Sequence, residues 1–260
     1  MRVLAYKTNN RHASVEAFNR TEIRMPFTPK DVLEVFGGEG TSQTVHYAAY
    51  HNLHSLTAWD IDPERARVLK ELIPDANVKV CDAFKEVHSL QPAYDVIVID
   101  NNVLQAPRFE HFDLFPAIFK GLKKHSFIII SVCSDPGSYY VYREAQVRAK
   151  LGSRTEAFVR DLDNARSEFY GIPPAAEEHY ALFSGRIMPI TSMSANDMVP
   201  IYTDLAIKAG FFTAYQTVLP RARYMSYIVL ELKHASSRQE METKTRDKLE
   251  KQRAEADESS

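Results

Sequence analysis

The sequence has little of three features that mark special classes of protein. It contains only two cysteines among 260 residues, which excludes a small fold held together by disulfide bonds. No run approaches the about 18 consecutive apolar residues that a membrane-spanning helix needs. The formal net charge is -2, so the molecule as a whole has no electrostatic attraction to nucleic acids or anionic membranes. What remains, with 45% hydrophobic and 25% charged residues, is typical of a globular protein with one large core.

Two further absences bear on the cellular setting. Cys81 and Cys133 both lie in apolar, strand-like runs, where they suit buried thiols in a reducing compartment better than a disulfide. The first ten residues lack the basic-then-apolar layout of a secretory signal. We therefore expect a cytoplasmic protein with no membrane partner.

Short apolar runs alternate with amphipathic stretches from residue 31 onward, which is typical of parallel βαβ units. The expected strands are residues 32–36, 56–60, 77–82, 94–100, 126–133, 212–219 and 224–232. The expected helices are residues 41–51, 61–72, 112–124 and 199–210, the first of them capped by Thr41 or Ser42. Only Pro220 to Arg223 join the last two strands, so these strands form an antiparallel hairpin. Arg221 and Arg223 lie in that turn, where they are either solvated, which we expect, or in contact with an anionic substrate.

These elements predict an α/β fold. Its core is a doubly wound, seven-stranded, mostly parallel sheet with a C-terminal antiparallel hairpin, plus a mainly helical insertion. The insertion is expected at about residues 134–200, because a connection of that length needs structure of its own. We expect the main domain to span residues 31–233, with residues 1–30 as a candidate lid and residues 234–260 as a charged, exposed tail.

Acidic residues stand at the ends of the predicted strands, where ligands bind in open α/β sheets. Asp60 lies about 20 residues beyond a glycine loop, a position from which a carboxylate accepts hydrogen bonds from both hydroxyls of a ribose. Asp82 ends the third strand and can take the exocyclic amine of an adenine, with Ile61 and Phe84 as apolar neighbours of the ring. Together these residues are complementary to an adenosine.

The loop after the first strand distinguishes between adenosine cofactors. Residues 32–40 read V-L-E-V-F-G-G-E-G, whereas a dinucleotide site needs G-x-G-x-x-G, so that free amides and a helix dipole meet the pyrophosphate. Glu39 stands among the glycines, and a carboxylate there repels a pyrophosphate but attracts a sulfonium or ammonium group. We therefore expect a cationic adenosine derivative and disfavour an NAD oxidoreductase.

These motifs, with Y-D-V-I-V-I-D-N-N at 94–102 and the terminal hairpin, resemble the ordered motifs of class I S-adenosylmethionine-dependent methyltransferases. The resemblance covers about residues 31–133 motif by motif and 201–233 by strand pattern. One departure is Phe36, which stands where the first glycine of the family's E-x-G-x-G-x-G belongs. The Pro-Cys pair of DNA cytosine methyltransferases and the P-P-Y or P-P-F of enzymes that methylate amino groups of DNA are missing after the fourth strand, which argues against an enzyme that modifies nucleic-acid bases.

The resemblance implies S-adenosylmethionine as cofactor and a set of residues that bind it. Glu34 and the loop would lie at its methionine part, Asp60 at its ribose, and Asp100 at the transfer site. The implied cofactor-binding residues are Glu34, Phe36, Gly37, Gly38, Gly40, Asp60, Ile61, Asp82, Ala83 and Asp100.

Methyl transfer from a sulfonium is an in-line displacement, and it needs a base only if the acceptor loses a proton. The candidate catalytic bases are Asp100, His111 and His179. A divalent metal on Asp100 and Asp135 is the alternative. We expect no metal site, because Pro136 follows Asp135 where some catechol-type O-methyltransferases have an asparagine.

The predicted function is therefore methyl transfer from S-adenosylmethionine to an oxygen or nitrogen of a small-molecule acceptor. Two alternatives stay open. One is an aminopropyl or other group transferase of the same fold, and the other is a non-catalytic adenosine-binding partner subunit. The acceptor and the oligomeric state do not follow from the sequence.

Overall fold

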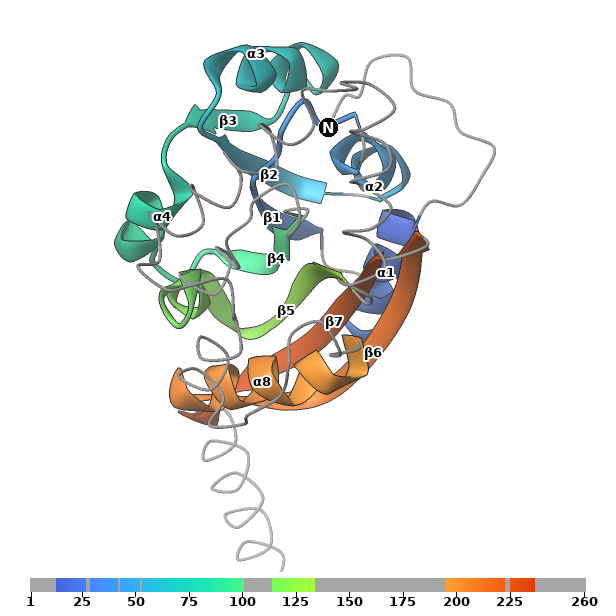
Figure 1. Cartoon of the computed structure of the whole chain (residues 1–260), viewed down its shortest axis with the longest axis vertical. Coiled ribbons are helices and arrows are strands. Elements are labelled where there is room, and N and C mark those ends of the chain that lie inside the picture. Colours follow the sequence, from blue (N-terminus) through green and yellow to red (C-terminus); the bar gives the residue numbers. More distant parts are fainter. Residues whose placement is uncertain are drawn as a thin grey trace, which may run out of the picture.

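The computed structural model describes residues 13–26, 29–41, 43–51, 53–100, 114–133, 195–222 and 225–236. Within these ranges the chain forms a seven-stranded sheet of order β3-β2-β1-β4-β5-β7-β6 (Figure 1). The strands are β1 (Lys30–Val35), β2 (Leu53–Asp60), β3 (Asn77–Val80), β4 (Tyr94–Ile99), β5 (Leu122–Cys133), β6 (Phe211–Ala222) and β7 (Met225–His234). Neighbouring strands are parallel except at β7, which is antiparallel to both β5 and β6. The predicted doubly wound sheet with a terminal hairpin is confirmed.

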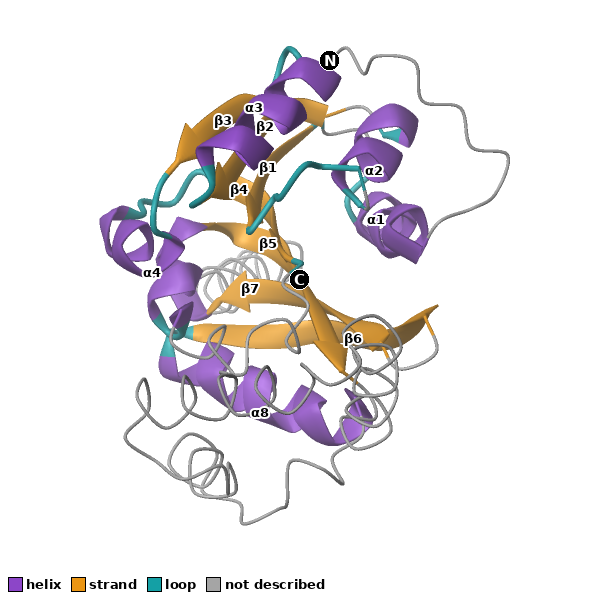
Figure 2. Cartoon of the chain, turned by 45° about the horizontal axis from the view of Figure 1, so that its top comes forward, coloured by secondary structure: helices purple, strands orange, loops and turns teal. Residues whose placement is uncertain are grey.

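Helices cover both faces of this sheet (Figure 2). One face carries α1 (Ala13–Arg24), α2 (Thr44–Tyr50) and α3 (Pro63–Leu72). The other carries α4 (Ala83–Glu86), the short 3-10 helices η1 (Val87–Ser89) and η3 (Ala117–Gly121), and α8 (Ala195–Lys208). Side chains alternate between the two faces along a strand, so Val32 of β1 belongs to the core on the side of α1, α2 and α3, while Leu33 belongs to the core on the side of α4 and α8. This two-sided burial explains why the central strands are almost wholly apolar.

The start of α2 differs from the prediction. The helix begins at Thr44, and its N-cap residue is Gln43, whose side chain makes no capping hydrogen bond, so the predicted cap at Thr41 or Ser42 is wrong. The backbone of the glycine loop takes over this role in part, because the Val45 N–H donates to the Gly40 carbonyl over 3.0 Å. The loop and the helix are therefore joined through main-chain atoms rather than through a capping side chain.

The segment before β5 also differs from the prediction. A helix was expected over residues 112–124, but the described part contains only the 3-10 helix η3, and β5 begins directly after it at Leu122. Pro116 precedes η3 and Gly121 ends it, and both residues are poor in the interior of an α-helix. In contrast, the predicted helix before β6 is confirmed as α8, and Gly210 follows it with a φ of +85°.

The helix α1 belongs to the core. Ala17 and Phe18 are completely or almost completely buried, and the Phe18 ring stacks on Tyr47 of α2 with centroids 4.2 Å apart. At the end of α1, Arg24 forms an ion pair with Glu231 of β7 and lies 4.5 Å from the ring centroid of Tyr215 on β6. The first helix is thus tied to the last two strands of the sheet.

Several sequence predictions fall outside the described residues. These are residues 1–12 of the candidate lid, the insertion up to residue 194, and the tail beyond residue 236, so the domain boundaries stay predictions. Cys81 is a free thiol and is half-buried, whereas the sequence predicted a buried one. Among the helices that the structure describes, none combines the length and apolar character that a membrane crossing requires.

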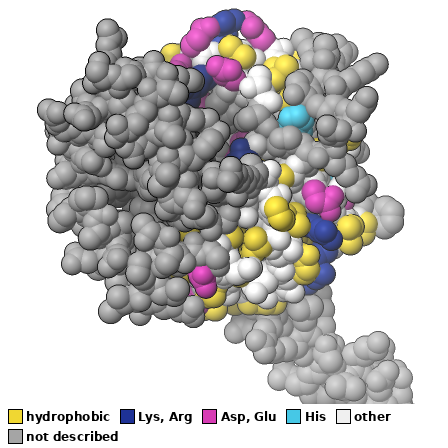
Figure 3. Space-filling model, turned by 45° about the vertical axis from the view of Figure 1, so that its right-hand side comes forward, with side chains coloured by type: hydrophobic (Ala, Val, Ile, Leu, Met, Phe, Trp, Pro, Cys, Tyr) yellow, Lys and Arg dark blue, Asp and Glu magenta, His cyan; other side chains and the backbone are white. Residues whose placement is uncertain are grey.

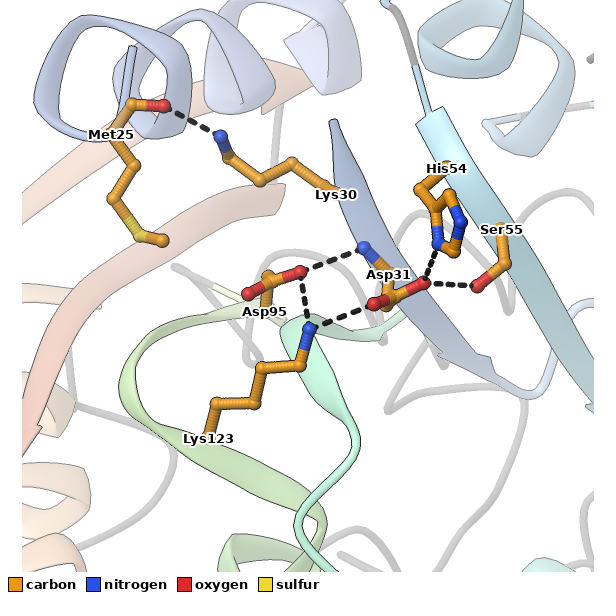
Figure 4. A network of polar contacts seen from close by, with 7 residues as sticks. All are labelled: Met25, Lys30, Asp31, His54, Ser55, Asp95 and Lys123. Carbon is orange, nitrogen blue, oxygen red and sulfur yellow. Dashed lines mark hydrogen bonds and ion pairs between the residues drawn. The ribbon is translucent and has the colours of Figure 1, made fainter. Parts of the chain in front are cut away.

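One polar cluster ties four strands together at the amino edge of the sheet (Figure 4). The Asp31 carboxylate of β1 accepts hydrogen bonds from His54 and Ser55 of β2, each over 2.6 Å, and from Lys123 of β5 over 2.7 Å. Lys123 also donates to Asp95 of β4 over 2.9 Å, and Asp95 accepts from the Asp31 backbone N–H over 2.9 Å. This Asp31 cluster sets the relative positions of β1, β2, β4 and β5.

We expect Asp31→Asn to destabilise the protein more at neutral pH than at acidic pH. Burial raises the pKa of Asp31, but the hydrogen bonds from Lys123, Ser55 and His54 outweigh it and leave the pKa below its usual value. A carboxyl group of this kind stabilises the fold above its unfolded-state pKa of about 4, and that contribution is lost as the pH falls. Urea unfolding should show a loss of about 1–3 kcal/mol at pH 7 and a smaller loss at pH 3.

Glu71→Gln is a matched control. Glu71 is also paired with a cation, Arg67, but its side chain is 64% exposed on α3, where acidic and basic side chains lie together at the top of Figure 3. Exposed ion pairs add little to stability because water screens them. Equal losses for Asp31→Asn and Glu71→Gln would contradict the role given to the Asp31 cluster.

Candidate functional site

The glycine loop, residues 36–40, lies against the carboxyl end of β2. The Gly37 N–H donates to the Trp59 carbonyl over 2.8 Å, and the Gly38 N–H donates to the Asp60 carboxylate over 2.7 Å. The second oxygen of Asp60 accepts from the Asp62 N–H over 2.8 Å. Asp60, the predicted ribose ligand, is thus held in one orientation by backbone amides, and each carboxylate oxygen keeps a second lone pair for a ligand.

The three glycines of this loop are needed for different reasons. A Cβ at Gly37 would lie 2.9 Å from the Leu69 side chain of α3, and a Cβ at Gly40 would lie 3.0 Å from it, so both glycines allow close packing on α3. Gly38 has a φ of +56°, and a Cβ added to it would have no neighbour within 4 Å among the residues that the structure describes. Gly38 is therefore the member of the loop that faces open space, where a ligand can approach the backbone.

Phe36 has a backbone conformation that ordinarily favours glycine. Its φ is +66°, in the left-handed region that a bulky residue rarely adopts. Its ring is half-buried and lies 5.7 Å from the ring of Phe84, measured between centroids. Contacts of the ring with Phe84 and the surrounding core thus hold the start of the loop in this conformation.

The adenine side of the predicted site is apolar and exposed. Ile61 is 71% exposed directly after β2, and Val80, which the sequence reasoning missed, is 52% exposed at the end of β3. Asp82 caps the short helix α4 by accepting from the Phe84 N–H over 3.1 Å, and Ala83 is buried behind it. The structure therefore brings Ile61, Asp82 and Ala83 to the same edge as Asp60.

Glu34 lies deep in the structure, two residues before the loop. It is 1% exposed and accepts a hydrogen bond from the hydroxyl of Tyr47 on α2. Burial raises the pKa of Glu34 to about 8, against the hydrogen bond from Tyr47 and with support from the charge of Asp100. Glu34 therefore carries a proton at neutral pH, and it takes part in the site as a neutral group.

Asp100 follows β4 and is paired with a residue from the far end of the chain. Arg221 donates from Nη1 to the Asp100 carboxylate and, over 2.6 Å, to the Ser131 hydroxyl, and the Tyr227 hydroxyl donates to Asp100 over 3.3 Å. The Asp100 side chain is only 4% exposed, and burial raises its pKa despite the opposing charge of Arg221. We call Glu34, Asp100, Ser131, Arg221 and Tyr227 the buried polar row.

The position of Arg221 corrects the sequence prediction. It was expected in a solvated turn, but β6 extends to Ala222 with an irregularity in its pairing between Pro220 and Ala222. Arg221 therefore lies in the sheet, and its side chain reaches across β7 and β5 toward β4. The proline beside it hid this strand extension, because proline is normally read as a turn residue.

Other predicted site residues lie outside the described part of the chain. These are the candidate bases His111 and His179, the alternative metal ligand Asp135, and Arg223. Within the described ranges, no group of three or more His, Cys, Asp and Glu side chains is placed to hold a metal ion.

We expect Glu34→Gln to flatten the dependence of stability on pH. An acid whose pKa is raised on folding contributes stability that is complete below its unfolded-state pKa of about 4.3 and is lost as the pH rises through its folded pKa. For Glu34 this window runs from about pH 4.3 to about pH 8. The wild-type protein should lose up to about 1.4 kcal/mol per pH unit there in urea unfolding, and the variant should not.

Glu231→Gln is the matched control. Glu231 is just as buried, but Arg24 and His125 outweigh the effect of burial and leave its pKa lowered. This variant should lose stability at neutral pH, because Arg24 loses its charged partner. Parallel pH curves for the wild type and Glu34→Gln would contradict the assignment of a proton to Glu34.

We further expect Phe36→Gly to be more stable than Phe36→Ala. Both variants lose the ring contact with Phe84, but only alanine keeps the strain of a positive φ. The difference in free energy of unfolding should be about 1 kcal/mol in favour of glycine, opposite to the usual order inside regular structure. A more stable alanine variant would show that the loop does not hold the left-handed conformation.

Among known proteins, the chain resembles solved structures in fold only. No protein-family model matches the chain, and no curated protein matches it. Magnesium protoporphyrin IX methyltransferase from Synechocystis PCC 6803, solved with bound SAH, is 13% identical with a TM-score of 0.48, over 84% of this chain and 80% of that one. A putative RNA methyltransferase from Pyrococcus horikoshii is 11% identical with a TM-score of 0.47, over 85% and 81%. The strand order and the antiparallel β7 confirm the sheet architecture that the sequence predicted.

Proposed function

We propose that the protein transfers a methyl group from S-adenosylmethionine to an oxygen or nitrogen of a small-molecule acceptor. The observation that carries this proposal is the hydrogen bond from the Gly38 amide of the glycine loop to the Asp60 carboxylate. This bond orients the carboxylate beside Ile61, an exposed apolar residue. A carboxylate, an open glycine backbone and an apolar surface suit the ribose, the methionine chain and the adenine of one ligand.

The hydrogen bonds within the loop favour this cofactor over a dinucleotide. The amides of Gly37, Gly38 and Gly40 donate to Trp59, Asp60 and Gly37 respectively. A pyrophosphate site needs such amides free to point at the ligand. Glu39 is exposed in the same loop, where its negative charge disfavours a phosphate.

The described residues have different roles in the proposed reaction. Asp60 binds the ribose, Ile61 and Ala83 lie beside the adenine, and Asp82 accepts from its amine. S-adenosylmethionine supplies an electrophilic methyl group, so the protein chiefly has to hold the acceptor in line with it. If the acceptor must lose a proton, Asp100 is the described candidate base, and Arg221 holds its carboxylate in place.

The buried polar row argues against the aminopropyl transferase. A polyamine substrate needs carboxylates with unbalanced negative charge. Asp100 is already paired with Arg221, and Glu34 carries a proton, so neither offers such a charge. A non-catalytic adenosine-binding subunit would bind the same cofactor. It would differ from the proposed enzyme only in having no methyl-transfer activity.

We expect the protein to bind S-adenosylhomocysteine and Asp60→Asn to weaken that binding by at least about tenfold, because a hydrogen bond to a charged group contributes about 1.5–3 kcal/mol. Isothermal titration calorimetry would measure the affinity, and thermal shift would compare S-adenosylmethionine, S-adenosylhomocysteine and NAD. Stabilisation by NAD alone would contradict the proposed cofactor.

Asp62→Asn is the control for this experiment. Asp62 is a neighbouring aspartate that caps α3 through the Glu64 and Arg65 amides, and asparagine caps a helix about equally well. This variant should fold and bind as the wild type does. Similar losses in both variants would show that the effect of Asp60→Asn reflects local damage to the loop.

A further inference from the structure

Arg221 brings a positive charge to the carboxyl edge of the sheet, on the side away from Asp60. In the strand order, β2 with Asp60 and β6 with Arg221 lie on opposite sides of β1 and β4. The adenosine part of the proposed cofactor lies at β2 and β3. Arg221 therefore lies toward the side of the sheet on which an acceptor, rather than the adenosine, has to bind.

Among the described residues, the hydrogen bonds of Arg221 come from one of its three side-chain nitrogens. Nη1 donates to Asp100 and to Ser131, which accounts for both of its hydrogens. The guanidinium carbon lies 5.2 Å from the ring centroid of Tyr227, so the group is held against an aromatic side chain. Within the described ranges, Nε and Nη2 have no hydrogen-bond partner.

The Nε–Nη2 edge has the geometry that binds a carboxylate or phosphate through two parallel hydrogen bonds. The Arg221 side chain is 15% exposed, whereas its partner Asp100 is 4% exposed. A ligand can therefore approach the guanidinium from outside the ion pair. An anionic ligand on this open side would add charge-assisted hydrogen bonds to a guanidinium that Asp100 and Ser131 already hold in place.

We propose that the methyl acceptor carries a carboxylate or phosphate group, which the Nε–Nη2 edge of Arg221 binds beside Asp100. This proposal rests on the proposed function, because it takes the anion to be part of the acceptor. It assigns Arg221 as a residue that determines substrate specificity, and it places the acceptor's anion at the end of β6.

The pairing with Asp100 explains how such an arginine can stand near a cationic cofactor. An unpaired guanidinium would repel a sulfonium, whereas the Arg221–Asp100 pair has no net charge. The same pairing weakens the attraction of Arg221 for an anion. Removing the charge of Asp100 should therefore strengthen anion binding.

The test uses the full chain labelled with nitrogen-15 and saturated with S-adenosylhomocysteine. Acetate and inorganic phosphate are titrated separately at constant ionic strength, as the carboxylate and phosphate probes. The Nε–H signal of Arg221, identified by its loss in Arg221→Lys, should shift and saturate with at least one probe. The absence of a saturable shift with both probes would overturn the proposal.

Variants separate anion binding from structural support. Amide signals of Ser131 and Tyr227 report binding when Arg221 itself is changed. Arg221→Lys keeps a cation for Asp100 but lacks the planar edge, so it should fold and bind the probe at least about tenfold more weakly. Asp100→Asn should bind it several-fold more tightly. Unchanged affinity in either variant would overturn the proposal.

A second arm distinguishes the acceptor from the cofactor as the source of the anion. If Arg221 instead binds the carboxylate of the cofactor, bound S-adenosylhomocysteine occupies the Nε–Nη2 edge. The probe will then shift the Arg221 signal only in the protein without S-adenosylhomocysteine, and the proposal fails. Binding of S-adenosylhomocysteine is measured in the same samples. Loss of that binding would contradict the proposed function, whereas cofactor binding without an anion shift contradicts only this inference.

Discussion

The structure of the sheet at its carboxyl edge depends on how the protein stabilises two buried carboxyl groups, those of Glu34 and Asp100. Removing a carboxylate from water is costly unless a partner or a proton neutralises it. Asp100 has Arg221 as its partner, and Glu34 keeps a proton and a hydrogen bond to Tyr47. The two solutions together leave the buried polar row without net charge. A row of this kind can lie beneath a charged cofactor without adding a strong field of its own.

The two edges of the sheet use charge differently. At the amino edge, Asp31 and Asp95 share Lys123, and the resulting cluster serves to hold strand ends in register. At the carboxyl edge, backbone amides orient Asp60, and Arg221 orients Asp100. The Nε and Nη2 donors of Arg221 have no acceptor among the described residues. Rigid support at one edge and partly unsatisfied polar groups at the other fit a sheet that binds its ligand at the carboxyl ends.

The sequence predicts those parts of the site that follow from local pattern. Asp60 and Asp82 end apolar runs, so their place at the strand ends follows from the strands themselves. Arg221 could not be placed in this way, because its partner Asp100 lies 121 residues earlier in the chain and the adjacent Pro220 suggests a turn. The proton on Glu34 depends on a helix and a strand that meet only in the folded state, and no local pattern encodes it.

The position of β7 between β5 and β6 has a consequence for synthesis on the ribosome. The strand β6 is made before β7 but joins the sheet only through it, so the sheet is incomplete until residue 234 has left the ribosome. The helix α1 is made first, yet it docks partly on these two last strands, and Arg24 finds Glu231 only then. Because domains fold as units during synthesis, the side of α1 that docks on β6 and β7 stays uncovered until both strands have been made. The burial of α1, the first of the described helices, is therefore completed only when the last described strand is in place.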